Sequence, residues 1–494
     1  MTSRSAIRVA LGGLLALAPC TASAQEVLVQ GDQRVQDPGE RGDRKFHGEA
    51  RLGARPGFIA EDPMFSIEPS VNFDLREIVP LEFRLGADIR LRMVDRAPEQ
   101  GQVIRGTDWD EPGDFITILQ ALRYEDAFVF ARHGQFSVDL RAGELGRVEL
   151  GHGSLVQGYA NSLDVDRRRT GIDFALRLDG LLLEQPAGVE LGLFVADLTG
   201  QQPLGARLGG HWAGAGLGLT VVGDPLAPRL ARPADPPDAF VVDAQNYLQR
   251  MGDRGVAAVG LDLSYRFTDR WRYWISPYLD LNALPGLGRG LHAGLDLEFA
   301  LGRRRRVHLG FVGEFTYGSD DYDPAYFDVF YTMQRTQAQF VAYPDDLPAS
   351  FGTLATPKYS FVDRRDLGGA GGYGAIRFAH DSGGFAETGY RYRPGPLGHT
   401  WETRVGVDVP EVQLALLHAH RGELGFNIIE PAGSLAAFEL NVPVLRYLDV
   451  SATAGWLYAT RRPIGGDATA GRVSSGFVGG AGLVLLGIAG RFPW

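Results

Sequence analysis

Apolar and polar positions alternate along residues 81–93, "LEFRLGADIRLRM". Every odd position from Leu81 to Met93 is apolar, whereas the even positions carry five charged residues and one glycine. Successive side chains of a β-strand point to opposite faces, so this period of two predicts a strand with one apolar and one charged face.

The same alternation recurs along the chain. Clear examples follow at residues 257–267, 271–282, 291–299, 307–316 and 448–458. We count roughly 16–22 such segments, most of them about 9–11 residues long, which is the length of a tilted strand that crosses a bilayer.

Two classes of connection separate these segments. Short connections occur at 76–80, 268–270 and 302–306, and long polar ones at 95–113, 154–169, 224–254 and 318–368. Tight turns at one end and long loops at the other are typical of an outer-membrane β-barrel. A loop as long as the last of these would be unusual in a compact soluble domain.

Composition agrees with one very large sheet. The chain has 494 residues and its 66 glycines are not gathered into a linker, so separate β-domains are not delimited. Beyond the first twenty residues, no apolar run is long enough for a transmembrane helix. The formal net charge of −11 argues against nucleic acid as a partner.

The N-terminus has the layout of a secretory signal peptide. A basic start and an apolar stretch lead to the small residues Ala22, Ser23 and Ala24, which predicts a signal peptide over 1–24 and cleavage before Gln25. The single cysteine, Cys20, lies inside it, so the mature chain has no disulfide. A lipoprotein anchor at Cys20 is the alternative, but the preceding proline disfavours it. We assign 25–43 to a periplasmic extension and 44–494 to the barrel.

The C-terminal segment "GLVLLGIAGRFPW" alternates apolar residues and ends on an aromatic. In this it resembles bacterial outer-membrane β-barrel proteins, whose last strand is recognised by the barrel-assembly machinery. The resemblance implies an all-β protein, a single transmembrane antiparallel β-barrel of roughly 16–22 strands in a Gram-negative outer membrane. Its partners would be outer-membrane lipid, lipopolysaccharide and the assembly machinery.

In a membrane barrel, the two faces of 81–93 contact different environments. The odd face meets lipid and the even face the interior, because the reverse would place three arginines in hydrocarbon at about 2–4 kcal/mol each. The same parity predicts a set of lumen-lining charged residues: Glu82, Arg84, Asp88, Arg90, Arg92, Asp262, Arg266, Arg272, Asp280, Asp296, Glu298, Arg306 and Glu314. They could set up a transverse field in an open channel or pair across a filled interior.

A second candidate site is enzymatic. His152 and Ser154 continue the parity of Val148 and Leu150, which places them in the lipid-facing row. The pair resembles the His-x-Ser of outer-membrane phospholipases and lipid A deacylases, in which His152 would be the general base for Ser154 and Asp166 would orient it. The residues after Ser154 are not the polar pair of the phospholipases, and the families' third member is Asn or Glu.

The long loops remain to be interpreted. The segment 154–169 could fold into the mouth of the barrel or remain outside with its charges self-paired. We expect the acidic, aromatic segment 318–331 to be a solvated surface loop, because its aspartates lack the spacing and glycine of a calcium loop. His418 and His420 share a face but have no further ligands nearby, so no metal or cofactor is expected.

The sequence therefore favours a porin-like channel for passive diffusion of small hydrophilic solutes, which needs no catalytic residue. Two alternatives stay open. One is an outer-membrane lipid hydrolase that uses His152, Ser154 and Asp166. The other is a structural or receptor barrel that acts through its long extracellular loops.

Overall fold

We analysed a computed structural model of the chain. It describes residues 47–493 apart from 60–61, 95–102, 106–107, 110–111, 130–134, 164–168, 181–186, 201–202, 228–229, 232–249, 252–254, 270–272, 303–305, 320, 337–338, 342–353, 357, 360–367, 395–398, 410–411, 423–433, 446 and 458–481. The predicted signal peptide and periplasmic extension therefore lie outside the described residues, as does the terminal Trp494.

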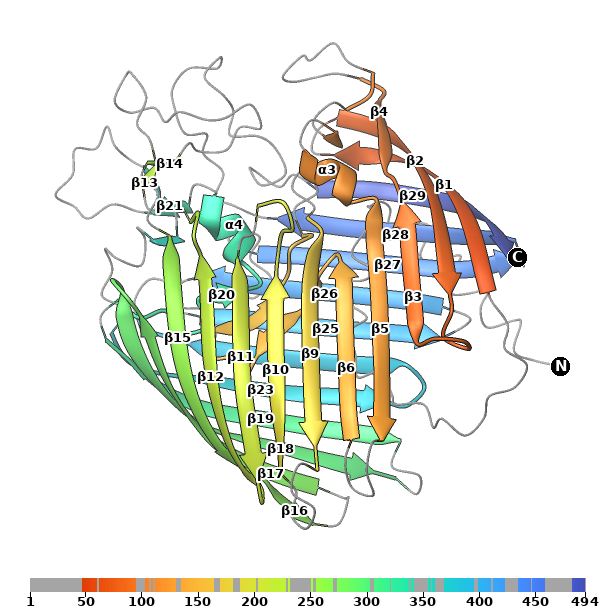
Figure 1. The fold of residues 1–494 in the computed structure, drawn as a ribbon. Helices are drawn as coiled ribbons and strands as arrows, with labels where there is room; N and C mark the ends of the chain where they lie inside the picture. Colours follow the sequence, from red (N-terminus) through yellow and green to blue (C-terminus); the bar gives the residue numbers. More distant parts are fainter. Residues whose placement is uncertain are drawn as a thin grey trace.

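The described strands form one closed antiparallel barrel (Figure 1). Neighbours along the chain pair in turn, and β1 closes the ring by pairing with β29. The sheet contains 22 strands, but β3 and β4 share one position against β2, and β15 and β16 share one against β17, which leaves 20 positions. The prediction of a single all-β barrel is confirmed.

The strands of the barrel are β1 (His47–Ile59), β2 (Asp62–Asp74), β3 (Leu81–Gly86), β4 (Ile89–Arg92), β5 (Leu119–Val129), β6 (Gln135–Gly143), β9 (Gly171–Asp179), β10 (Ala187–Val195), β11 (Leu204–Trp212), β12 (Ala215–Asp224), β15 (Val256–Tyr265), β16 (Phe267–Asp269), β17 (Tyr273–Leu284), β18 (Gly288–Leu301), β19 (Val307–Gly318), β23 (Gly369–His380), β24 (Gly384–Tyr392), β25 (His399–Val409), β26 (Val412–Gly422), β27 (Ser434–Leu445), β28 (Leu448–Leu457) and β29 (Gly482–Pro493).

Shorter elements lie in the connections: α3 (Pro112–Ile116), β7 (Val148–Leu150), β8 (Val156–Tyr159), β13 (Leu230–Ala231), β14 (Arg250–Met251), β20 (Phe327–Asp328), α4 (Tyr331–Thr336), β21 (Gln339–Val341) and β22 (Leu354–Thr356). Within the described part of the chain, no helix has the length and apolar character to cross a membrane.

The two faces of the wall differ as the alternation predicts. On β12, Leu217 and Leu219 are about half exposed on the outer face, whereas Thr220, Val222 and Asp224 are buried toward the interior. Large apolar side chains are exposed in the same way on β15, β17 and β19. An apolar outer face around a polar interior defines a transmembrane β-barrel, since closure leaves no unpaired strand edge in lipid.

Residues 81–93 do not form one continuous strand. The ladder breaks between β3 and β4, opposite Pro69 of β2, which has no N–H to donate to the strand. At the break Gly86 leaves room for Gln120, whose side chain lies where a Cβ would stand. The predicted faces are retained, because Leu85 and Met93 are exposed while Arg90 is buried.

Candidate functional site

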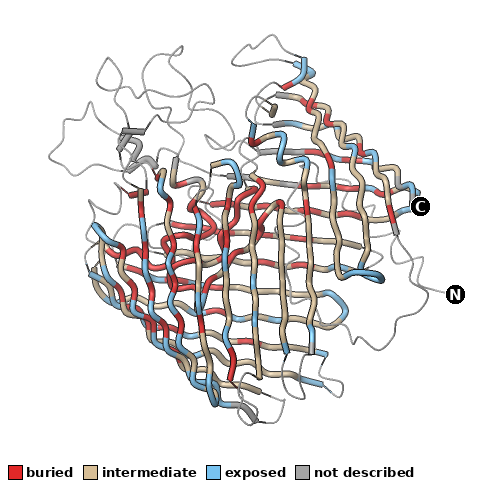
Figure 2. The backbone as a smooth tube through the Cα atoms, in the orientation of Figure 1, coloured by how far each residue is buried: buried red, intermediate tan, exposed pale blue. Residues whose placement is uncertain are grey.

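Two connections fold into the barrel instead of projecting from it. We call residues 144–163, between β6 and β9, the first inner loop, and residues 321–336, between β19 and β23, the second inner loop. Their strands β7, β8 and β20 form a small sheet of their own, in which Val156 of β8 pairs in parallel with Phe327 of β20. Figure 2 shows buried residues concentrated where this sheet lies behind the front wall.

Apolar contacts hold the inner loops to two separate parts of the wall. Leu150, Leu155 and Tyr159 of the first loop and Tyr326 of the second share a buried cluster with inward side chains of β10, β12, β15 and β17. A second cluster joins Val329 and other loop residues to β26 and β27. The inner loops therefore bridge the lumen, and the part of 154–169 that the structure describes up to residue 163 folds into the barrel.

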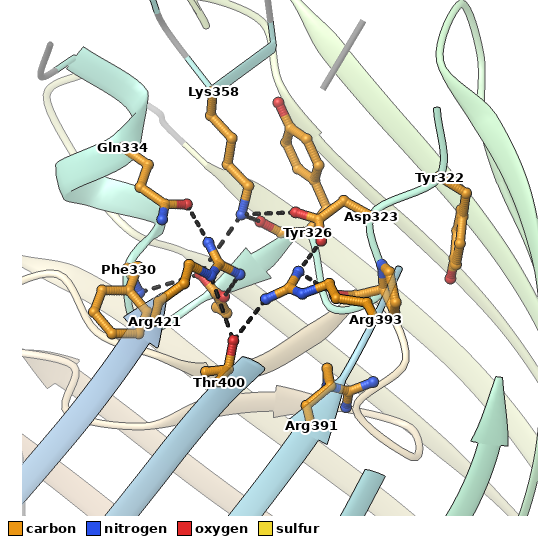
Figure 3. Close-up of polar contacts among 12 residues, drawn as sticks. Tyr322, Asp323, Tyr326, Phe330, Gln334, Lys358, Arg391, Arg393, Thr400 and Arg421 are labelled. Carbon is orange, nitrogen blue, oxygen red and sulfur yellow. Dashed lines mark hydrogen bonds and ion pairs between the residues drawn. The ribbon is translucent and has the colours of Figure 1, made fainter. Parts of the chain in front are cut away.

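Arginines on β25 and β26 and directly after β24 hold both loops to the wall, and Figure 3 shows Arg393 and Arg421 beside the second inner loop. Arg404 donates to the carbonyl oxygens of Gly146 and Gly158 at 3.2 and 3.1 Å. Arg421 donates to Asp328 at 2.7 Å, and Arg393 pairs with Asp323. These three arginines are nearly inaccessible to solvent, so the loops are seated on them.

Lys358 pins a later part of the same connection onto the second inner loop (Figure 3). Its ammonium donates to the carbonyl oxygen of Tyr326 at 2.5 Å and lies 3.3 Å from Asp323 and 3.6 Å from Asp328. Asp323 and Asp328 thus form ion pairs with one lysine and two arginines of the wall.

Histidine and tyrosine side chains attach the inner loops to another part of the wall, on β17 and β18. His152 Nδ1 lies 2.8 Å from Asp280 Oδ1, and its ring stacks on Tyr278 at 4.1 Å between centroids. Asp280 and its neighbour Asp262 hold the pKa of His152 above its usual value; burial opposes them and is the largest single influence. Tyr322 of the second loop lies 2.6 Å from His292 of β18.

The structure corrects the placement of the enzymatic candidate. His152 and Ser154 are not in the lipid-facing row, because the chain leaves the wall after β6 and turns inward through Gly143, Gly151 and Gly153, all with positive φ. The parity argument assumed an uninterrupted strand. The partner of the His152 ring is Asp280, and Asp166 lies outside the described residues.

The expected surface position of 318–331 is also wrong. Tyr322, Asp323, Tyr326 and Phe327 are almost completely buried inside the barrel. Aromatic side chains and wall arginines offset the free energy that is lost when these aspartates leave water. The local sequence does not show these arginines, because they come from distant strands.

The predicted lumen residues occupy different environments. Asp262 pairs with Arg207, Glu314 contacts His292 and Arg391, and both carboxylates are buried beneath or beside the inner loops. Arg90 is buried against Asp88 and Asp108. The structure thus brings Asp262, Asp280 and Glu314 to one region and Arg90 to another.

The remaining predicted residues lie nearer the rims or in less enclosed parts of the wall. Glu82 contacts Arg76, Glu298 contacts His308, and Arg266 is exposed over Trp274. Arg84 and Arg92 lie on β3 and β4, Asp296 on β18, and Arg306 in an exposed position before β19. Arg272 lies outside the described residues.

The interior on the β6–β10 side remains accessible to water. Asp139 and Arg141 of β6 are each 33% exposed, and Arg177 of β9 and Glu190 of β10 are 58% and 31% exposed. Asp280, beneath the first inner loop, is 2% exposed. The inner loops therefore bury charges such as Asp280 and leave charged side chains of β6 and β9 in contact with water.

Sequence analysis missed the fastening arginines. Arg391 and Arg393 alternate with tyrosines in "YRYR", and Arg404 lies in the alternating segment of β25, so period-two parity could have found them. Their loop partners could not be found, because Arg404 and Gly158 are 246 residues apart. Among the described residues no three His, Cys, Asp or Glu side chains gather as a metal site.

No model of a known protein family and no curated protein matches this sequence. Solved structures are similar at low identity. The siderophore receptor PirA from Acinetobacter baumannii is 9% identical, with 91% of this chain and 81% of that chain covered and a TM-score of 0.34.

Two further solved structures cover more of their own length. Acinetobacter baumannii OccAB4 is 10% identical, covering 93% of this chain and 100% of that one at a TM-score of 0.31. Pseudomonas aeruginosa OpdK with vanillate is 11% identical, covering 91% and 98% at a TM-score of 0.30. Fold and site together define a transmembrane β-barrel whose interior is constricted by two inward-folded loops.

Proposed function

We propose that this protein is an outer-membrane, porin-like channel for passive diffusion of small hydrophilic solutes, constricted by its two inner loops. One observation supports this above all: charged side chains of β6 and β9 inside the lumen remain accessible to water although two loops bridge it. A wall of about twenty strands encloses more space than side chains alone can fill.

The outer surface supports the membrane location. Four large apolar side chains are each more than half exposed: Leu208, Leu217, Phe315 and Ile488. Contact of these side chains with water is unfavourable, whereas contact with lipid is favourable. The predicted signal peptide and aromatic C-terminus are consistent with export to a Gram-negative outer membrane.

Conductance of the purified protein in planar bilayers tests the proposal. The wild type should conduct ions. Arg141→Glu with Arg177→Glu should shift its preference toward cations, because both side chains lie on the accessible face.

The matched control exchanges charges without changing their sum. Asp139→Arg with Arg141→Asp keeps the lumen charge constant, so its ion preference should stay near that of the wild type. A bilayer that stays sealed at every voltage would favour the structural or receptor barrel instead.

A further inference from the structure

A small polar pocket lies between the first inner loop and the wall. It is lined by His152 and Ser154 from the loop and by Thr220, Asp262, Asp280 and Asn282 from β12, β15 and β17. The pocket has room for about one water-sized body.

One oxygen points into this pocket without a partner. Asn282 is 4% exposed, and its Oδ1 accepts no hydrogen bond from any residue that the structure describes. A Cβ built on Gly260 would lie 2.5 Å from this oxygen, so the absence of a side chain at Gly260 leaves the space in front of it.

A neighbouring hydrogen bond determines which amide atom faces the pocket. The Asn282 Nδ2–H donates to the Tyr322 hydroxyl oxygen at 3.0 Å, and that hydroxyl lies 2.6 Å from Nε2 of His292. The amide nitrogen is thereby used, and the carbonyl oxygen is left for the pocket.

The charge of this corner is negative. The carboxylates of Asp262 and Asp280 line the pocket, and Arg207 pairs with Asp262. Two carboxylates and one guanidinium leave a formal charge of −1 when His152 is neutral. An occupant of opposite charge would offset the cost of holding these carboxylates away from bulk water.

We propose that the pocket binds one calcium ion. Beside the imidazole of His152 and three leucines, the lining includes two carboxylates, an amide carbonyl and two hydroxyls, and hard oxygens of this kind suit Ca²⁺. Only two of these ligands would be carboxylates, because neutral oxygens complete the set. Hydrated Mg²⁺ is too large for the space, since it retains several waters.

The ion would join the first inner loop to three wall strands. Ser154 comes from the loop, and its own carbonyl oxygen accepts from Ala325 of the second loop. Calcium bound here therefore stabilises the seated position of both loops, whether or not the barrel conducts solutes.

Calcium chloride titration of the full chain in detergent micelles, after chelator treatment, tests the site. By calorimetry, Asn282→Leu and Gly260→Ala should each lose one equivalent of bound calcium. Asn282→Asp, which adds a charged ligand, should bind that equivalent about tenfold more tightly. Magnesium should compete at least about tenfold more weakly.

Gly313→Ala is the matched control, because a Cβ there meets nothing within 4 Å. Heat-dependent gel mobility identifies any variant that fails to fold, and the tighter binding of Asn282→Asp cannot arise from misfolding. Equal calcium stoichiometry and affinity in the wild type and every variant would overturn the proposal and leave the pocket to a water molecule only.

Discussion

Arg393 and Asp323 form an ion pair between the wall and the second inner loop, with side-chain exposures of 2% and 0%. Lys358 shares the same carboxylate. Asp323→Ala would leave two buried cations with less compensation, so we expect the free energy of unfolding to fall by about 3–5 kcal/mol. Urea unfolding in lipid vesicles measures it.

Arg76→Ala is the control for Asp323→Ala, because it removes an ion pair at the surface instead of a buried one. Arg76 is 59% exposed in a turn and pairs with Asp74, so its loss should cost at most about 1 kcal/mol. Equal costs for the two substitutions would contradict the role of Asp323 as a buried fastening.

His152 predicts a pH dependence of stability. It lies in the first inner loop, outside the spanning strands, and contacts Asp280 and Tyr278. Its folded-state pKa is above the usual 6.5, so its stabilising contribution is complete below 6.5 and is lost as pH rises through the raised pKa. Between pH 6 and pH 9 the thermal midpoint of the wild type should fall more than that of His152→Gln. Parallel curves would show that the pair does not contribute.

At the scale of elements, the inner loops should be removable without loss of the wall. Each barrel strand pairs with its two neighbours in the ring, and β7 and β8 pair only with each other and β20. Replacing 148–159 by a short glycine-serine linker should therefore raise single-channel conductance, because the covered side of the lumen opens. The same linker inserted at 381–383, a turn at the other end, should leave conductance unchanged.

The strands themselves predict a depth-dependent cost. Leu261 lies mid-strand on the outer face of β15, and Leu445 lies at the end of β27. Leu261→Arg should lower the free energy of folding into lipid by about 2–4 kcal/mol, and Leu445→Arg by about 0–1 kcal/mol. Folding titrations in vesicles compare them, and a larger cost at Leu445 would contradict the assigned membrane depth.

At the scale of the whole molecule, closure depends on the contact between the two ends of the described chain. β29 pairs with both β28 and β1. A chain that ends before Gly482 leaves two long strand edges unpaired in hydrocarbon, so it should fail to enter the membrane fraction. Intact truncated protein recovered from outer membranes would show that closure is achieved in another way.

The sequence by itself determined the barrel. Period-two alternation predicted the strands at β15, β17, β18 and β19, and it assigned their faces, because lipid and water penalise the opposite orientation at every residue. It also distinguished short turns from long connections. These properties are local, so each segment carries its own information.

Only the tertiary structure decided what fills the lumen. The inward fold of the two loops depends on partners such as Arg404 for Gly158 and Arg421 for Asp328, which are 246 and 93 residues apart. The aspartates and tyrosines of 318–331 predicted a surface loop, because their arginine partners lie far away in the sequence. The same holds for His152, whose local pattern pointed to lipid while the turns at Gly143 and Gly151 carried it to Asp280. Charge compensation across a barrel is a property of the closed ring, and no single segment contains it.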